Sequence, residues 1–159
     1  MTVCAIMQPT YLPWMGYFGM MDRVDTFVLL DSVQFERRSW QQRNRIKTPR
    51  GAEWLTVPIL SRGKHGQIIS ETQIDPQGNF PESHIRALEL NYARAPHFNS
   101  YAERIFSVLR SGTTSAGMLN GLLIDTLKDI LGITTPFVYS STIDQEGKKA
   151  DLLVSICKK

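Results

Sequence analysis

Two short apolar runs near the start of the chain stand on either side of a segment with helical character. Residues 3–7 are apolar and end at Gln8, and residues 26–30 are apolar, partly β-branched and aromatic, and end at Asp31. Short apolar runs with such boundaries predict buried strands. Residues 16–24 between them predict a helix. This β-α-β order predicts two parallel strands joined by a right-handed crossover.

The remaining residues contain two more runs of strand character, followed by a long helical part. Residues 54–60 and 68–74 predict strands on either side of a loop, and the alternating polar positions of 68–74 suit a partly exposed edge strand. A returning strand is predicted at residues 136–139. Apolar residues at helical spacing, with proline in one first turn, predict helices over residues 81–91, 98–109, 115–131 and 150–158.

This order of elements predicts an α/β fold with a short, mainly parallel, Rossmann-like sheet and a helical C-terminal half. A length of 159 residues and a hydrophobic fraction of 42% suit one domain with a substantial core, so we expect a single α/β domain over residues 1–159. The net charge of +3 and the pI of about 9.0 suit a small anionic ligand. They do not by themselves indicate nucleic acid.

The sequence shows neither a secretory signal nor an apolar run of the roughly 20 residues that cross a bilayer. Cys4 and Cys157 lie in apolar stretches near opposite ends, and we favour two buried free thiols over a disulfide. His84 and His97 lack metal-ligand spacing, and no glycine-rich phosphate motif is present. We therefore expect a soluble, cytoplasmic protein with no membrane span, no metal and no cofactor.

The loop of residues 8–17 is the most distinctive segment, because its two prolines stiffen it at the place where open α/β sheets bind ligands. Gln8 and Tyr11 offer hydrogen bonds, Trp14 offers a stacking face, and the backbone N–H groups near Gly16 could meet an anion. Tyr17 closes the segment. The alternative is that the three aromatic residues fill the core beneath a proline-rich turn.

A second candidate follows the second predicted strand. Asp31 would point into the same crevice as the first loop, where it could hold a sugar hydroxyl or accept from an amine, with Gln34 nearby. The alternative is that Asp31 forms an Asx turn or caps the next element.

The third candidate is the basic segment of residues 37–47. Arg37, Arg43 and Lys47 suit phosphate or carboxylate groups, and Trp40 could stack on a base or a sugar ring. Asn44 interrupts the basic run. The alternative is a solvated basic surface with one structural tryptophan. RNA binding is less favoured, because the rest of the chain is not basic.

A fourth candidate is the glycine-containing loop of residues 62–66. His65 could act near neutral pH or close over an anion. The alternative, a mobile surface hairpin, is the favoured interpretation.

Four blocks of sequence together resemble the WbqC-like protein family. They are residues 8–18, with Gln-Pro-Thr-Tyr-Leu-Pro-Trp-Met-Gly-Tyr-Phe, and residues 24–28, 31–35 and 40–47. Residues 54–58, 92–98 and 152–158 continue the likeness in order. The resemblance implies a role linked to bacterial surface polysaccharide and O-antigen gene clusters. Members of the family tend to run longer, with another strand and helix, so we expect this chain to be truncated relative to them.

The first 35 residues are also similar to the start of nucleotidylyltransferases such as pantothenate synthetase. In that group a strand leads to Pro-Thr, and a His-x-Gly-His turn follows at a helix start. Here Pro9-Thr10 is present, but Trp14 and Tyr17 replace the two histidines. This likeness implies a nucleotidylyltransferase-like scaffold, whereas the chemistry of those histidines is absent from these positions.

These observations lead to two hypotheses. The first is a transferase of surface-polysaccharide synthesis that acts on an activated amino sugar. The second is a non-catalytic module that binds a nucleotide-sugar or a partner enzyme. The expected ligand is a nucleotide-sugar or an activated acyl donor; nucleic acid is not expected, and a homodimer is compatible with the sequence. We expect Gln8, Asp31 and Arg43 to surround one pocket. The expected catalytic residues are Asp31, Gln8 and Asn44, and the expected binding residues are Tyr11, Trp14, Gly16, Tyr17, Gln34, Arg37, Trp40, Arg43, Lys47 and His65.

Overall fold

The computed structural model describes residues 2–159 and has ten regular strands and helices within that range. The strands are β1 (Cys4–Met7), β2 (Thr26–Leu29), β3 (Arg43–Thr48), β4 (Gly51–Thr56) and β5 (Phe137–Tyr139). The helices are α1 (Met15–Met21), α2 (Phe80–Tyr92), α3 (Phe98–Leu109), α4 (Ala116–Ile130) and α5 (Ala150–Cys157). Two short 3-10 helices, η1 (Ile69–Glu71) and η2 (Ser140–Thr142), complete the described elements.

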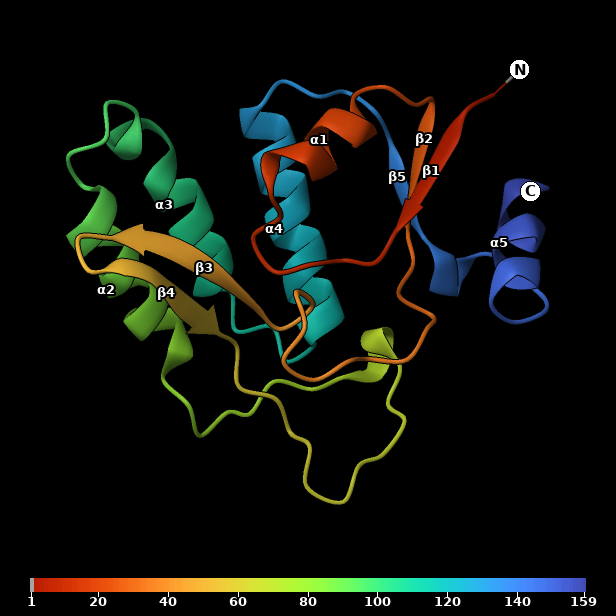
Figure 1. Cartoon of the computed structure of the whole chain (residues 1–159), viewed down its shortest axis with the longest axis horizontal. Helices are drawn as coiled ribbons and strands as arrows, with labels where there is room; N and C mark the ends of the chain where they lie inside the picture. The colour runs from red at the N-terminus through yellow and green to blue at the C-terminus, as the bar shows by residue number, and fades with distance from the viewer. Residues whose placement is uncertain (1) are drawn as a thin grey trace.

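A parallel sheet joins the first two strands of the chain to its last strand (Figure 1). Its order is β1-β2-β5, and β2 runs parallel to both neighbours, in register from Cys4 opposite Thr26 to Met7 opposite Leu29. The predicted parallel pair is therefore confirmed. Phe27 and Leu29 of the central strand are fully buried, and they pack with Tyr17 and other residues of α1 and α4.

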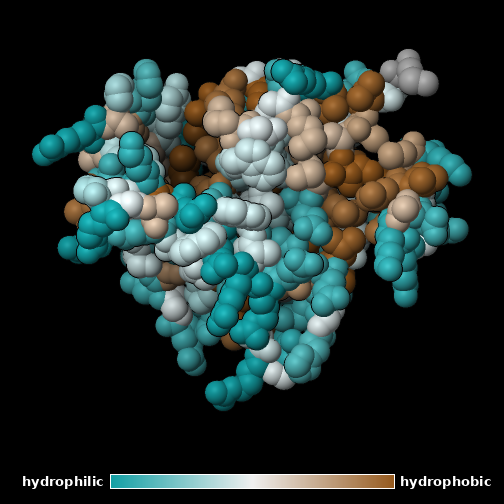
Figure 2. Space-filling view, viewed as in Figure 1, coloured by the Kyte–Doolittle hydropathy of each residue, from teal (hydrophilic) through white to brown (hydrophobic). Residues whose placement is uncertain are grey.

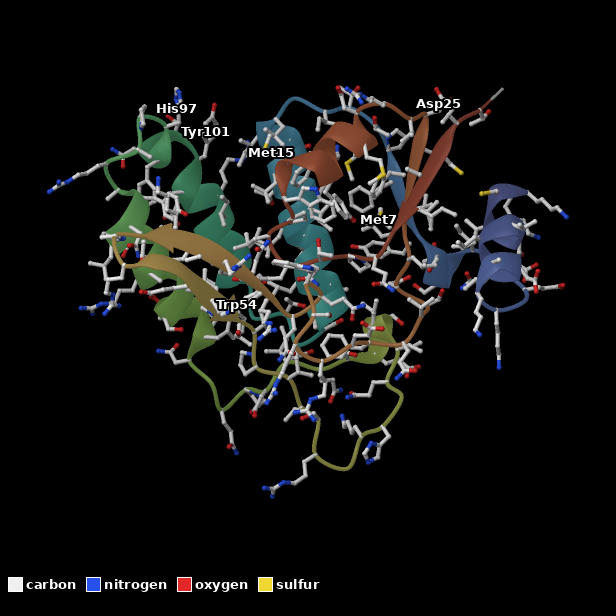
Figure 3. The ribbon with its side chains drawn as sticks, in the orientation of Figure 1. Met7, Met15, Asp25, Trp54, His97 and Tyr101 are labelled. Carbon is white, nitrogen blue, oxygen red and sulfur yellow. The ribbon has the colours of Figure 1, made fainter. Side chains whose placement is uncertain are left out.

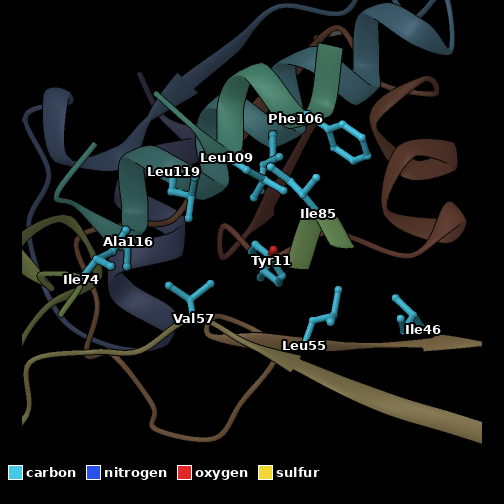
Figure 4. Close-up of a cluster of buried hydrophobic side chains, with 11 residues drawn as sticks. Tyr11, Ile46, Leu55, Val57, Ile74, Ile85, Phe106, Leu109, Ala116 and Leu119 are labelled. Atoms are coloured by element: carbon cyan, nitrogen blue, oxygen red, sulfur yellow. The ribbon is translucent and has the colours of Figure 1, made fainter. Parts of the chain in front are cut away.

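An antiparallel hairpin, formed by β3 and β4, makes a second, separate sheet. Its inward residues Ile46 and Leu55 face α2 and α3, where they meet Ile85 and Phe106 in a buried cluster (Figure 4). Tyr11, from the loop after β1, inserts into the same cluster. The strands alternate between buried and exposed positions, so the other face of the hairpin is left to solvent.

Helix α4 joins the two halves, because its residues enter both buried clusters. Ser115 begins it as an N-cap, whose hydroxyl accepts a hydrogen bond from the backbone N–H of Met118 at 3.2 Å. Two glycines of this helix sit against other elements. A Cβ at Gly117 would press on the carbonyl of Ile69, and one at Gly121 would overlap the hydroxyl of Tyr139.

The fold is mixed α/β with a parallel sheet of three strands, and the hairpin stands apart from this sheet. One expectation about strands needs correction. Residues 68–74 are not a strand. They contain η1, isolated bridges from Ile68 and Ile74, and backbone bonds to several segments, including Ser70 N–H to the carbonyl of Asp31 at 3.0 Å. The segment buries Ile69, Thr72 and Ile74, a spacing that a strand with one buried face does not produce.

The predicted helices are all present, with ends shifted by at most two residues in the second half of the chain. The strand predicted at 54–60 begins earlier and is shorter, since β4 ends at Thr56. Within residues 2–159, no helix combines the length and the apolar character needed to cross a membrane.

Candidate functional site

Asp31 lies two residues after the end of β2 and connects the carboxyl ends of two parallel strands. Its side chain is 4% exposed and accepts hydrogen bonds from the Ser140 hydroxyl at 3.1 Å, the Ser141 N–H at 2.8 Å and the Ser141 hydroxyl at 2.7 Å. The Ser140 oxygen in turn lies 3.1 Å from the N–H of Asp31, which donates to it. The carboxylate therefore ties the end of β2 to η2, directly after β5. Neither serine was among the residues singled out from the sequence.

A small pocket of about 280 Å³ opens beside this contact. The N-terminal residues of α4 form one wall of the pocket, and Tyr139 lines another. Burial and the negative charges of Asp31 and Asp125 raise the pKa of Tyr139. Gln8 and Arg43 are not among the lining residues of the pocket, so this pocket is not the one expected around Gln8, Asp31 and Arg43. The lining residues are Asp31, Ser70, Ser115, Gly117, Met118, Tyr139, Ser141 and Thr142.

Gln8 takes part in a polar network that holds the first loop against α4. Its Oε1 accepts from Nε2 of Gln41 at 2.9 Å, and Oε1 of Gln41 accepts from the N–H of Glu36 at 2.8 Å. Asn120 of α4 donates to the carbonyls of Pro9 at 3.2 Å and Gln41 at 2.8 Å. Gln41 and Asn120 are nearly fully buried, so the network satisfies polar groups in the interior.

Asn44 performs a similar task on the other side of the loop. Its Nδ2 donates to the carbonyls of Leu12 at 2.6 Å and Tyr11 at 3.2 Å, and its Oδ1 accepts from the N–H of Arg45 at 2.7 Å. Leu12 has a φ of 46°, a left-handed backbone conformation that is costly for leucine. The bonds from Asn44 hold this turn in place, so Asn44 shapes the loop.

Tyr11 and Tyr17 are fully buried, as in the alternative interpretation of core aromatics, and neither presents surface to a ligand. Tyr11 bonds through its hydroxyl to Nδ1 of His84 at 2.7 Å, while the Tyr17 hydroxyl donates to the carbonyl of Gln8 at 3.3 Å. Burial raises the pKa of both phenols. It lowers the pKa of His84 to about 4, so this histidine is neutral at physiological pH.

The exposed face of the hairpin collects aromatic and cationic side chains. Arg43, Arg45 and Lys47 alternate along β3 with buried positions, and Arg45 lies opposite Trp54 of β4. The guanidinium carbon of Arg43 lies 4.1 Å from the Trp54 ring centroid, and that of Arg45 lies 5.3 Å away. Trp40 adds a second ring, with centroids 5.5 Å apart. We name this set, formed by Trp40, Arg43, Arg45, Lys47 and Trp54, the Trp–Arg surface.

Charge on the Trp–Arg surface is unbalanced. Among the residues that the structure describes, no carboxylate pairs with Arg43, Arg45 or Lys47; the nearest ion pair along the hairpin joins Arg50 to Glu53 at 3.0 Å. The Nε atom of Arg43 is buried and has no hydrogen-bond partner in this part of the chain. Trp40 and Trp54 are 47% and 45% exposed, so the surface combines free cations with partly exposed aromatic side chains.

Part of this surface was predictable from the sequence. Trp40, Arg43 and Lys47 were expected binding residues. The structure brings Trp40 and Arg43 together on the Trp54 ring, and Lys47 lies farther along β3 on the same face. Arg45 and Trp54 were not singled out. The signal for Arg45 is the period of two in Arg43, Arg45 and Lys47, which predicts one face of a strand. Trp54 joins them only through the hairpin register.

A model of the WbqC-like protein family matches residues 8–159. The chain belongs to this family. It is 37% identical to the uncharacterized protein Rv1507c of Mycobacterium tuberculosis over 155 residues, which cover 97% of this chain and 67% of that protein. No solved structure matches the chain. The resemblance drawn from the sequence blocks is thereby confirmed.

The other expected binding residues of this WbqC-like chain are dispersed. The indole of Trp14, which is 52% exposed, lies against Gly16 at the start of α1, where a Cβ would meet its Nε1. Gln34 bridges to Ile68, and Arg37 and His65 are exposed in loops. Across residues 2–159, no three His, Cys, Asp or Glu side chains are grouped to hold a metal ion.

Figure 3 shows the separation between the two regions of the WbqC-like chain that carry candidate chemistry. Met7, at the carboxyl end of β1, and Trp54, on the hairpin, lie on opposite sides of α4 in this view. The polar side chains after the parallel strands, Gln8 and Asp31, make hydrogen bonds within the fold, whereas the cationic side chains of the hairpin face lack an acidic partner in the described residues. The Trp–Arg surface is therefore the stronger candidate for ligand binding.

Proposed function

We propose that this chain binds a nucleotide-sugar on the Trp–Arg surface and serves in bacterial surface-polysaccharide synthesis. One observation carries the proposal: the guanidinium of Arg43 is held 4.1 Å from the ring of Trp54, beside the ring of Trp40, without an acidic partner in the described residues. A ligand that joins flat rings to phosphate groups matches both halves of this arrangement.

Each half has its own chemistry. The exposed indole of Trp40 offers a π-face on which a base stacks, a contact worth about 1–3 kcal/mol per base, and it packs equally against the apolar face of a sugar ring. Arginine presents a planar fork of donors that fits two phosphate oxygens at once. Trp54 lies beneath both guanidinium groups, so it orients these donors before a ligand arrives and reduces the ordering that binding requires.

Sugar and phosphate are also what the family context favours. The resemblance described above links WbqC-like proteins to surface-polysaccharide gene clusters, and activated sugars are the usual building blocks of polysaccharide synthesis. The mildly basic balance of the chain, with a net charge of +3, agrees with an anionic ligand.

Binding without turnover is the form of the proposal that the contacts favour. The three side chains expected to act in catalysis are all engaged within the fold: Gln8 with Gln41, Asp31 with two serines, and Asn44 with the carbonyls of the first loop. A transferase would need at least one of them to release its partners. The transferase hypothesis is therefore kept as the alternative that the same experiment decides.

The test is a titration of the purified chain with UDP-N-acetylglucosamine, UDP and N-acetylglucosamine 1-phosphate, followed by calorimetry. We expect the intact nucleotide-sugar to bind most tightly, and its affinity to fall with salt, since charge contributes to it. Trp54→Ala and Arg43→Gln should each weaken binding by about tenfold. Matched controls are Tyr101→Ala and Arg94→Gln, an exposed aromatic and an exposed cation off the Trp–Arg surface.

Equal affinity in Trp54→Ala and in the wild type would refute this site, and no binding of any of the three compounds would refute the proposed ligand class. Incubation of the same mixtures with acyl and aminoacyl donors, followed by mass spectrometry, separates the two roles. A new sugar product would establish the transferase. Binding that raises the melting temperature while the sugar stays unchanged supports the binding module.

A further inference from the structure

The two cysteines of the chain meet although 153 positions separate them. Cys4 lies in β1 and Cys157 is the last residue of α5, and their Sγ atoms are 3.6 Å apart. Both thiols are free, as expected, but Cys4 is half-buried and Cys157 is exposed, whereas the sequence led us to expect both to be buried. Both thiols are free in this structure, at a distance that calls for only a small adjustment to form a bond.

The helix that carries Cys157 is lightly held. Ile156 is its one buried residue in the described structure, whereas Leu153 and Val154 are 40% and 52% exposed. Beneath it, a hollow of about 530 Å³ lies between the helix and the strands, lined in part by Cys4, Val28 and Cys157. Figure 2 shows hydrophobic side chains gathered over β1 and the adjoining side of α5. Few buried contacts imply that α5 opens more readily than the core.

We propose that Cys4 and Cys157 form a reversible disulfide that fastens α5 to β1 when the surrounding thiol pool is oxidised. The reaction is an exchange with a small-molecule disulfide, such as glutathione disulfide. The exposed Cys157 thiolate attacks one glutathione sulfur, forming a mixed disulfide and releasing one glutathione. The Cys4 thiolate then attacks the Cys157 sulfur and releases the second. Two protein thiols are oxidised, one glutathione disulfide is reduced, and the two protons pass to the departing thiolates.

The environment of each thiol supports this order of events. Cys157 is exposed, so a bulky oxidant can reach it. Burial raises the pKa of Cys4, and its hydrogen bond with Cys157 raises it further, so Cys4 is held as a thiol until the mixed disulfide forms beside it. Cys4 therefore acts second, as the resolving residue, within reach of the sulfur that it attacks.

The test uses the full chain, equilibrated with reduced or with oxidised glutathione. After oxidation we expect a monomer whose intact mass is lower by two hydrogens, with no thiol left to titrate after unfolding. Amide hydrogen exchange in α5 should slow by about tenfold compared with the reduced chain, because the crosslink opposes opening of the helix. Exchange in α2, far from the crosslink along the chain, is the internal reference.

Single variants isolate the two steps. Cys4→Ser should accumulate a stable glutathione adduct on Cys157, and Cys157→Ser should resist oxidation under the same conditions. The proposal is overturned by a stable glutathione adduct on the wild-type chain, by disulfide-linked dimers in place of the internal bond, or by α5 exchange that oxidation leaves unchanged.

Discussion

The hydroxyl of Tyr11 lies 2.7 Å from Nδ1 of His84, and both side chains are buried. A hydrogen bond between the imidazole and the backbone of Thr56 fixes the other side of the ring. The neutral ring thus accepts from the tyrosine and donates to a carbonyl. This contact joins the loop after β1, helix α2 and strand β4, three segments that enclose the same buried cluster.

We expect His84 to make the stability of the chain depend on pH. Burial lowers its pKa from 6.5 to about 4 in the folded state, so between these values the unfolded chain binds more protons. Stability is then fully present above pH 6.5 and falls as the pH approaches 4, by about 3 kcal/mol in total. Urea unfolding at a series of pH values measures this slope.

His84→Gln should flatten the pH dependence in that window, whatever it does to the absolute stability. His97→Gln removes an exposed histidine and is the matched control, for which the wild-type slope should remain. A slope that is identical in His84→Gln and in the wild type would show that other groups cause the pH dependence.

Tyr11→Phe should destabilise the chain by about 1–3 kcal/mol, because it leaves Nδ1 of His84 buried without a partner while it preserves the ring. Tyr101→Phe, on an exposed side chain, should change the free energy of unfolding by less than about 0.5 kcal/mol. Denaturant unfolding at pH 7 compares the two. Equal losses would mean that the hydroxyl of Tyr11 contributes nothing specific.

These buried contacts show where reasoning from the sequence succeeds and where it ends. The local sequence pattern is enough to predict the helices, because the apolar residues of α3 and α4 are spaced along the faces that pack in the core. It also suffices for the parallel pair, because a β-α-β order restricts the topology. The sequence left open whether Tyr11 binds a ligand or packs in the core. Its position in a loop does not indicate that it contacts His84 of α2, 73 positions later.

The same limit applies to the Trp–Arg surface and to residues 68–74. Trp40 was predicted as a binding residue because it lies among arginines in the sequence. Trp54 lies on the same surface only because the register of β3 and β4 places it opposite Arg45. Residues 68–74 alternate as a strand would, but the N–H groups of Ile69 and Ser70, in η1, donate to the carbonyls of Val33 and Asp31 in the segment after β2. Non-local hydrogen bonding decided that segment against its own pattern.

Substitution of Asp31 tests whether this side chain has a structural or a catalytic role. Asp31→Ala removes the acceptor for Ser140 and Ser141, so we expect a loss of about 2–3 kcal/mol in the free energy of unfolding. Asp144→Ala, at a carboxylate with 90% of its side chain exposed, should have little effect. Thermal and urea unfolding measure both. A variant of unchanged stability that fails to bind the nucleotide-sugar would instead support the role first expected from the sequence.

Gly121 and Tyr139 provide a test of how α4 is fitted to the parallel sheet. A Cβ at position 121 would overlap the Tyr139 hydroxyl and crowd its ring, so Gly121→Ala should cost about 1–3 kcal/mol although alanine favours helices. Removal of the hydroxyl in the double variant Gly121→Ala with Tyr139→Phe should recover part of that loss. Gly19→Ala, in α1 with no atom within 4 Å of the added carbon, should stabilise the chain by about 0.5–1 kcal/mol. A double-mutant cycle from urea unfolding measures the interaction energy between positions 121 and 139. Side chains in direct contact show such an energy. Strict additivity of the two substitutions would therefore mean that the Tyr139 ring and α4 do not meet as described.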